Sequence, residues 1–182
     1  MSALTDRLFF ALRPAAATVA AVEALSAQLR AEQGLQGAPL PCAQLHITLH
    51  HLGDFSRFPQ ELAQRAMAAA ATLHVAPFEL VLDQAISFSR RPPRKQPCVL
   101  LAGEPLAPLK AFHAALVAAL KAAELYRYAS FRPHLTLLYD RRAIAPQPVA
   151  PLRWTATEFL LVDSLLGQGR HEVLAAWPLR AA

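Results

Sequence analysis

The sequence contains little cysteine and little glycine, and it has no long apolar run. The two lone cysteines, Cys42 and Cys98, offer neither a disulfide framework nor paired zinc spacing, so we expect a reduced, cytoplasmic protein. The six glycines are not grouped, which excludes a glycine-rich nucleotide loop, and the Gly-x-Ser-x-Gly elbow of serine hydrolases does not occur. The apolar run at residues 8–12 stops at Arg13-Pro14, too early for a signal-peptide core, and no stretch approaches the ~20 apolar residues of a membrane span. We therefore expect no membrane partner.

The composition is that of a well-packed and basic protein. Of the 182 residues, 54% are hydrophobic and 17% are charged, which predicts one domain over residues 1–182, built as one unit or as two closely packed lobes. The formal net charge is +5, supplied mostly by arginine, and it favours anionic partners such as nucleic acid or phosphorylated small molecules. A general preference for Ala, Arg and Pro in the sequence gives the same balance, so the charge alone identifies no partner.

One short phrase occurs twice, as His-Ile-Thr-Leu at residues 46–49 and as His-Leu-Thr-Leu at residues 134–137. On an extended strand, side chains i and i+2 point to the same face. Each phrase therefore presents one imidazole and one hydroxyl to one surface, His46 with Thr48 and His134 with Thr136. Two such strands side by side would supply the groups for acid–base chemistry on a phosphate ester.

The surroundings of the phrase are repeated as well, which indicates an internal duplication. In each half a short apolar strand leads through a proline-started, alanine-rich helix and a loop to the His-x-Thr strand. The first repeat covers about residues 7–50 and the second about residues 98–138. The predicted elements are a strand at 7–12, a helix at 14–30, a strand at 44–50, and then a strand at 98–102, a helix at 105–124 and a strand at 131–139.

The rest of the chain is predicted to complete two pseudo-symmetric lobes. We expect a helix, strands ending in a hairpin through Gly167-Gln168-Gly169, and two proline-rich connections without regular structure. These are the helix 59–73, the strands 78–88, 154–166 and 172–178, and the connections 89–97 and 145–151. The predicted class is α+β, with an antiparallel sheet and outer helices in each lobe and the two sheets facing a central cleft.

The remaining histidines are weaker candidates for chemistry. His46 and His50 have the i, i+4 spacing of a zinc pair on a helix, but the sequence here favours a strand and offers no well-placed acidic third ligand, so we expect no metal. On a regular strand His50 shares a face with His46 and lines the edge of the cleft. His171, in the late hairpin, is within reach of the cleft or exposed on the surface. His74 and His113 are expected at the surface.

The chain resembles the 2H phosphoesterase superfamily, specifically the RNA 2′,3′-cyclic phosphodiesterase family of bacteria and archaea, historically called 2′-5′ RNA ligase. Four stretches carry the resemblance, at residues 7–14, 45–54, 131–140 and 161–179, and together they span nearly the whole chain. Two departures are visible. An Ala-Arg pair often follows the second motif in the family, where this chain has Leu138-Tyr139, and His171 stands where a tyrosine is usual.

The resemblance implies a substrate and a mechanism. RNA with a 2′,3′-cyclic phosphate end, or a nucleoside cyclic phosphate, is hydrolysed to a 2′-phosphate, without a metal or other cofactor, by a monomeric RNA-processing enzyme. His46 is implied as the proton donor and His134 as the proton acceptor, while Thr48 and Thr136 bind the non-bridging oxygens. An ordinary imidazole pKa near ~6.5 lets either histidine take either role.

Substrate contacts and rival functions stay open at this point. Arg132 flanks the second motif and is a candidate for phosphate contact, as are His50, His171 and the basic segment that contains Arg91. That segment is equally compatible with a solvated loop. The alternatives are a related phosphodiesterase for a small cyclic phosphate of nucleotide or ADP-ribose type, and an RNA-binding module without catalysis. Ligation of RNA ends is the reverse reaction.

Overall fold

The structure is a computed structural model that describes residues 3–91, 94–104, 106–127 and 130–181. Within these residues the chain forms three α-helices, eight strands and one short 3₁₀ helix, η1. In chain order the elements are β1 (Asp6–Leu12), α1 (Ala16–Gln33), η1 (Cys42–Gln44), β2 (Ile47–Phe55), α2 (Gln60–Ala70), β3 (Phe78–Ser87), β4 (Gln96–Ala102), α3 (Ala107–Ala122), β5 (His134–Asp140), β6 (Gln147–Ala156), β7 (Glu158–Leu165) and β8 (Arg170–Pro178). The combination of helices with antiparallel strands confirms the predicted α+β class.

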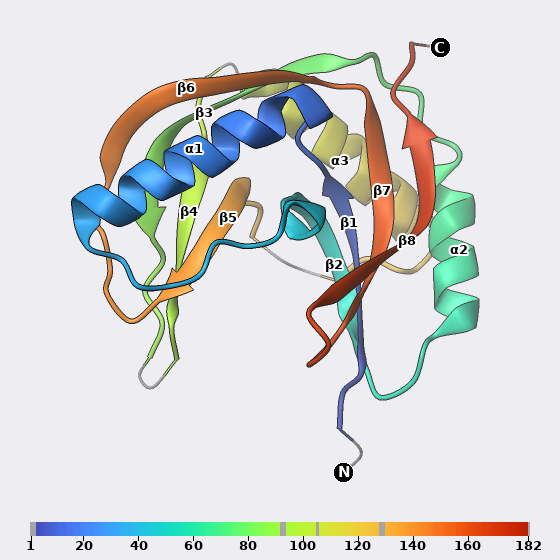
Figure 1. The fold of residues 1–182 in the computed structure, drawn as a ribbon. Helices are drawn as coiled ribbons and strands as arrows, with labels where there is room; N and C mark the ends of the chain where they lie inside the picture. The colour runs from blue at the N-terminus through green and yellow to red at the C-terminus, as the bar shows by residue number, and fades with distance from the viewer. Residues whose placement is uncertain (1–2, 92–93, 105, 128–129, 182) are drawn as a thin grey trace.

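The strands are ordered β6-β3-β4-β5-β2-β1-β7-β8, and every neighbouring pair is antiparallel. Two groups of four strands meet at β5 and β2, where Ile47 and Leu135 are the paired residues. The two halves are thus joined into one sheet along a narrow contact, where the sequence alone predicted two facing sheets. Figure 1 shows the two motif strands at this junction, with β6 and β8 at the outer edges.

Helices α1 and α3 connect the two halves of the sheet. Helix α1 follows β1 but contacts β5 and β6, and it lies over the β3–β6 side in Figure 1. Helix α3 follows β4, and its Phe112 ring lies 5.1 Å from that of Phe159 in β7 and 5.8 Å from that of Phe78 in β3. Fully burying one such side chain is worth about 1.5–3 kcal/mol. This crossed packing holds the two halves together and leaves the opposite face of the central strands free.

The ends of α1 show how the sequence delimits the helix. Pro14 stands just before it, and its last residue, Gln33, is followed by Gly34 with φ 63°, whose N–H bonds the carbonyl of Arg30. A left-handed residue after the last turn suits glycine, which has no Cβ to clash. The helix therefore extends past the predicted end at residue 30 and stops where the backbone conformation requires.

The predictions for two connecting segments and one strand were wrong. The proline-rich segment 145–151 was expected to be a connector, but β6 starts at Gln147 and includes Pro148 and Pro151. Strand β6 is at the edge of the sheet, where a proline without an N–H leaves no partner strand unsatisfied. The predicted strand 154–166 is two strands, β6 and β7, which break at Thr157 and belong to opposite halves. At the end of the predicted loop 89–97, Gln96 and Pro97 already belong to β4.

The predicted hairpin is confirmed, with β7 and β8 paired from Leu165–Arg170 to Glu158–Pro178.

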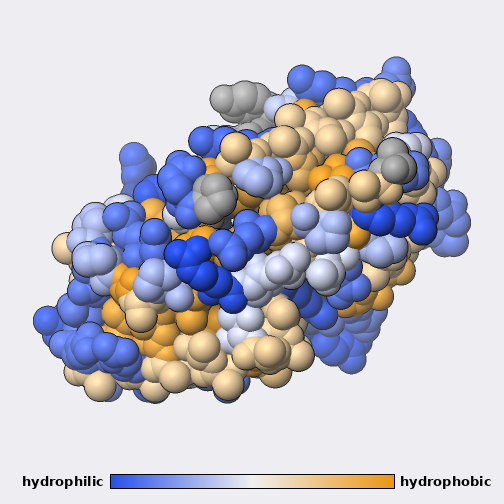
Figure 2. All heavy atoms as spheres, turned by 90° about the horizontal axis from the view of Figure 1, so that it is seen from above, coloured by the Kyte–Doolittle hydropathy of each residue, from blue (hydrophilic) through white to orange (hydrophobic). Residues whose placement is uncertain are grey.

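Figure 2 looks at the molecule from above the view of Figure 1, and pale orange apolar residues occupy much of this face. Helix α1 contributes exposed alanines to the surface, which explains part of the high apolar fraction. Among the described residues, no helix combines the length and the apolar character that crossing a membrane requires.

Candidate active site

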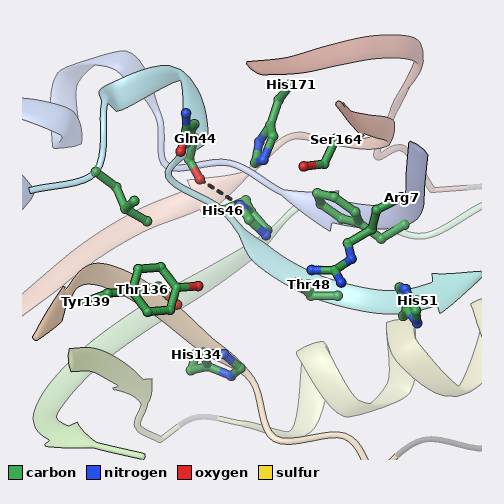
Figure 3. Close-up of a pocket in the computed structure, with 12 residues that line it drawn as sticks. Arg7, Gln44, His46, Thr48, His51, His134, Thr136, Tyr139, Ser164 and His171 are labelled. Atoms are coloured by element: carbon green, nitrogen blue, oxygen red, sulfur yellow. Dashed lines mark hydrogen bonds between the residues drawn. The ribbon is translucent and has the colours of Figure 1, made fainter. Parts of the chain in front are cut away.

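The two motif strands turn their aliphatic residues into the core and their histidines and threonines to the free face. Ile47 and Leu135 are fully buried, whereas His46, Thr48, His134 and Thr136 are partly exposed. Because β2 and β5 are antiparallel around the Ile47–Leu135 pair, continuing the register by one residue puts His46 opposite Thr136 and Thr48 opposite His134. All four side chains line one cavity of about 500 Å³ (Figure 3).

The two motif histidines make the same backbone hydrogen bond. The Nδ1 atom of His46 lies 2.7 Å from the carbonyl oxygen of Gln44, and the Nδ1 atom of His134 lies 2.7 Å from that of Arg132. A carbonyl oxygen only accepts, so Nδ1 carries the hydrogen in both rings. In the neutral form, Nε2 of each imidazole is therefore the unprotonated nitrogen and is free to exchange a proton with a ligand.

A β-bulge follows the threonine in both motifs and changes which residues face the cavity. Thr48 is opposite Ala11 and His50 is opposite Phe10, so Leu49 has no partner across the β1–β2 pair. In the β4–β5 pair the register likewise skips Leu137, between Thr136 and Leu138. One extra residue shifts the alternation of side chains. The fifth residues after the motif histidines, His51 and Tyr139, consequently line the cavity.

The bulge also corrects the prediction for His50. This side chain is only 3% exposed, is stacked on Tyr126 at 5.4 Å, and has its Nε2 atom 3.5 Å from the backbone N–H of Arg127. Burial lowers its pKa to about 4, so it is a neutral core residue near pH 7. The expectation that His50 shares a face with His46 was wrong, because it assumed strict alternation along β2.

Burial and nearby positive charge keep the motif histidines neutral when no ligand is bound. The pKa of His46 is lowered to about 4, mainly because burial disfavours the imidazolium, and also by the nearby His171, His134 and Arg13. The pKa of His134 is lowered in the same way, with Arg132 as a further cause. The backbone carbonyls act in the opposite direction, since they stabilise the charged rings. An anion between the two imidazoles would favour their protonation.

Aromatic rings hold both histidines. The ring of Phe9 lies 4.8 Å from that of His46, and the ring of Phe88 lies 4.8 Å from that of His134. His171 from β8 meets the His46 ring nearly edge-on at 5.3 Å, and it lines the cavity. These contacts restrict the orientation of each imidazole, so that both Nε2 atoms face the cavity.

The two predicted arginines lie outside the cavity lining. Arg132 is exposed, and its guanidinium lies over the Phe88 ring at 4.4 Å, so it contacts the ring that supports His134 and acts on that histidine through its charge. Arg91 is exposed in the segment between β3 and β4, and nothing places it at the cavity. Its neighbour Arg90 comes closer, with its guanidinium 5.7 Å from the centre of the Tyr139 ring.

A cross-strand row of polar residues at the cavity was not predicted. Arg7 in β1 is the Cα partner of Asp54 in β2 and of Ser164 in β7, and Ser164 is the partner of His171 in β8. Arg7 and Ser164 line the cavity together with His51 (Figure 3). Arg7 lies in one of the stretches that carry the family resemblance, but its position at the site depends on strand pairing across the whole chain.

The cavity offers no obvious metal centre. Among the residues that the structure describes, no group of three or more His, Cys, Asp or Glu side chains is arranged to hold a metal ion. What the site does offer is two imidazoles with free Nε2 atoms, two threonine hydroxyls and one guanidinium. Such a set can exchange protons with a bound phosphate ester and donate hydrogen bonds to its oxygens.

Comparisons with known proteins agree with this geometry. The model of the 2′-5′ RNA ligase superfamily matches residues 13–167. Three solved structures are similar over nearly the whole length: LigT of E. coli in apo form (26% identity, TM-score 0.75, 98% of this chain and 99% of that chain), a phosphoesterase (25%, 0.76, 97% and 99%), and TT0787 of Thermus thermophilus (25%, 0.72, 96% and 98%). A comparison with curated protein sequences found no match.

Proposed function

The chain belongs to the 2′-5′ RNA ligase superfamily, and on that premise we propose that it hydrolyses RNA 2′,3′-cyclic phosphate ends to 2′-phosphates. Membership in this family of phosphoesterases supports a hydrolase in general terms. One observation carries the specific proposal: two imidazoles with equivalent backbone hydrogen bonds present unprotonated Nε2 atoms to one cavity. E. coli LigT, the structurally similar protein, has been solved with 3′-AMP and with phosphate, which supports a nucleotide phosphate as the ligand.

In the proposed reaction the cyclic phosphate lies between His46 and His134. One imidazole accepts a proton from water at Nε2 while the water oxygen bonds to phosphorus. The bond from phosphorus to the 3′ oxygen breaks, and the Nε2–H of the other, protonated imidazole donates its proton to that oxygen. The hydroxyls of Thr48 and Thr136 donate hydrogen bonds to the non-bridging oxygens, where negative charge increases in the transition state.

The family resemblance implies that His46 is the donor and His134 the acceptor. A donor must be protonated before the reaction, yet burial lowers the pKa of His46 to about 4 in the protein alone. The negative charge of the bound phosphate reverses this effect, because an adjacent anion favours the imidazolium. We therefore propose that substrate binding raises the pKa of the donor histidine, which then takes up a proton from the solvent.

The surface next to the cavity supports an RNA substrate. Arg90, Arg91, Arg94 and Lys95 are exposed in the β3–β4 segment, and Arg90 reaches the Tyr139 ring at the cavity wall. Cationic side chains at this edge would attract the phosphates of an RNA strand that leaves the cavity. The cavity volume of about 500 Å³ is within the range typical of small-ligand sites and also suits a mononucleotide. A small cyclic phosphate is therefore the second candidate substrate.

The experiment is a turnover assay with the purified protein in the presence of EDTA. An RNA oligonucleotide with a 2′,3′-cyclic phosphate end and the matching nucleoside 2′,3′-cyclic phosphate are supplied separately, and ³¹P NMR identifies the product. We expect conversion to a 2′-phosphate, with a higher kcat/KM for the oligonucleotide. Turnover of the mononucleotide alone would establish the second candidate instead. Binding of RNA without turnover of either compound would contradict the catalytic proposal.

The cysteines bear on the cellular setting of the proposed enzyme. Cys42 is exposed and Cys98 buried, and both are free thiols, which suits an enzyme that works in the reducing cytoplasm.

A further inference from the structure

A second group of polar side chains occupies the cavity beyond Thr48. On the free face of β2 the order is Thr48, His51 and Asp54, and their partners on β1 are Ala11, Phe9 and Arg7. Arg7 thus lies four residues along β1 from the strand position that faces Thr48, a separation of roughly 13 Å between backbone positions at ~3.3 Å per residue. Its side chain lines the same cavity, although its backbone is distant from Thr48 along the strand.

Arg7 is fixed in one orientation by its neighbour strand. Its Nε donates to Oδ1 of Asp54 at 2.7 Å and its Nη2 donates to Oδ2 at 2.6 Å, a two-point contact between planar groups. His51 holds the same carboxylate, with its Nε2 atom 2.8 Å from Oδ1 of Asp54. Arg7, and to a smaller extent His51, lower the pKa of Asp54 to about 2, so the carboxylate stays ionised.

This arrangement leaves most of the guanidinium unused. A guanidinium has five N–H donors, and Asp54 takes the one on Nε and one of the two on Nη2. The two hydrogens of Nη1 and the second hydrogen of Nη2 remain, and the Nη2 hydrogen with the adjacent Nη1 hydrogen forms a fork that can bind two oxygens of a phosphate. The Arg7 side chain is 45% exposed, so a ligand in the cavity can reach this fork.

Two further groups stand beside the fork. The hydroxyl of Ser164 extends from the Cα partner of Arg7 on β7, toward the same part of the cavity (Figure 3). His51 donates from Nε2 to Oδ1 of Asp54, the oxygen that also accepts from Nε of Arg7, so it helps to hold the carboxylate that orients the guanidinium. The carboxylate is thus held from two sides, and the remaining N–H donors of Arg7 stay available to an anion in the cavity.

The reacting phosphate does not account for this group. His46, His134 and the two threonines already surround the position between the motif strands, and Asp54 anchors Arg7 at the other end of the row. We propose that Arg7 and Ser164, with Asp54 and His51 holding Arg7 in position, form a second phosphate subsite, which binds the phosphate on the 5′ oxygen of the nucleotide whose cyclic phosphate is hydrolysed. This inference rests on the proposed function and names a specificity determinant for it. In RNA the occupant is the adjacent phosphodiester, and in a free nucleotide it is a 5′-monophosphate.

The test compares three substrates that share one reacting end. They are a nucleoside 2′,3′-cyclic phosphate, the same compound with a 5′-phosphate, and a dinucleotide that ends in the 2′,3′-cyclic phosphate. For the unchanged protein we expect kcat/KM to be on the order of 10-fold to 100-fold higher when the 5′ oxygen carries a phosphate, as for a hydrogen-bonded charged group. A preference for the dinucleotide identifies RNA as the source, and a preference for the monophosphate alone identifies a free nucleotide.

The Arg7→Gln variant should reduce this preference to near unity, whatever its activity on the unphosphorylated compound. Arg7→Lys should restore it in part, because the charge remains but the fork is lost. The matched control is Arg153→Gln, since Arg153 pairs with Glu79 across β6 and β3 at 3.0 Å, is exposed, and lies outside the cavity. It should retain the preference. Ser164→Ala should lower the preference by a smaller factor, and it tests the subsite even if a change at Arg7 impairs folding.

Three results would overturn the inference. The first is an unchanged protein that hydrolyses all three substrates with equal kcat/KM, which leaves the proposed function intact. The second is an Arg7→Gln variant that loses activity by the same factor on all three, because Arg7 would then bind the reacting phosphate. The third is no turnover of any substrate by the unchanged protein, in which case the proposed function fails and the subsite fails with it.

Discussion

The two motif strands hold their histidines in the same way, but the residues around the two histidines differ. In each motif the Nδ1 atom of the histidine bonds the carbonyl two residues earlier at 2.7 Å, an aromatic ring lies 4.8 Å away, and a bulge follows the threonine. The neighbours then differ. His46 lies beside a third imidazole, that of His171, while His134 is supported by Phe88, which also contacts the Arg132 guanidinium.

The fifth residues after the two histidines differ as well. His51 takes part in the Arg7–Asp54 group, whereas Tyr139 lies under Arg90. The short motif thus determines which atoms face the cavity, and the neighbouring strands determine the charge around them. Two related strands have become chemically unequal through residues that the motif does not contain.

The strongest test of this comparison removes one imidazole at a time. His46→Ala and His134→Ala should each lower kcat/KM by about 10²–10⁴-fold, because each removes one of the two proton transfers. The double variant should lose far less than the product of the two factors, since residues that act as a unit are not additive. Steady-state kinetics on a 2′,3′-cyclic nucleotide measure all three.

His74→Ala serves as the control, because His74 is outside the cavity and its Nδ1 atom lies 3.2 Å from the carbonyl of Thr72. It should retain activity. A loss confined to one of the two motif variants would show that only one histidine transfers a proton, and that the structural equivalence of the strands has no counterpart in the mechanism.

The threonines come next in expected effect. Thr48→Val and Thr136→Val keep the shape of the side chain and remove the hydroxyl donor, so each should lower kcat by roughly 10–10²-fold through weaker stabilisation of the phosphoryl oxygens. Comparable losses would support two equivalent donors. If kcat stayed constant and only KM rose, the hydroxyls would bind substrate and transition state equally, contrary to the proposed role.

The third prediction concerns the protonation of the two histidines. Without a ligand, His46 is neutral above about pH 4, and a bound dianion should raise its pKa. Sulfate affinity should therefore increase as pH falls from 8 toward 5, by up to about tenfold per pH unit for each proton taken up. Sulfate keeps its charge over this range, so the trend reports the protein. Titration of the imidazole C–H signals by NMR, with and without sulfate, should show a larger shift for His46 than for His134, and pH-independent affinity would contradict the mechanism.

The sequence predicted the duplicated frame and the four motif residues because these features depend on local patterns. Helical spacing, a proline at the helix start and alternation along a strand are all visible within a few residues. The bulges at Leu49 and Leu137 cannot be recognised from local sequence, because nothing in these residues indicates that they lack a partner on the neighbouring strand. For this reason His50 was expected in the cavity, where His51 lies. The place of Arg7 was missed because it depends on pairing with Asp54 and Ser164, which are distant in sequence.

The smallest expected effect concerns His171, a third imidazole at the cavity, whose ring lies 5.3 Å from that of His46. The positive charge of a protonated His171 lowers the pKa of His46, so His171→Tyr should raise that pKa while an aromatic ring stays beside it. Burial and Arg13 also lower the pKa of His171 itself, so the ring is charged only at acid pH. The pKa of His46, followed by NMR titration of its imidazole C–H signals, should therefore rise by less than about one unit, and the pKa of His134 should change less. An unchanged pKa of His46 would show that His171 acts on His46 through ring contact and not through charge, and the chemical inequality of the two motif strands would then depend on packing.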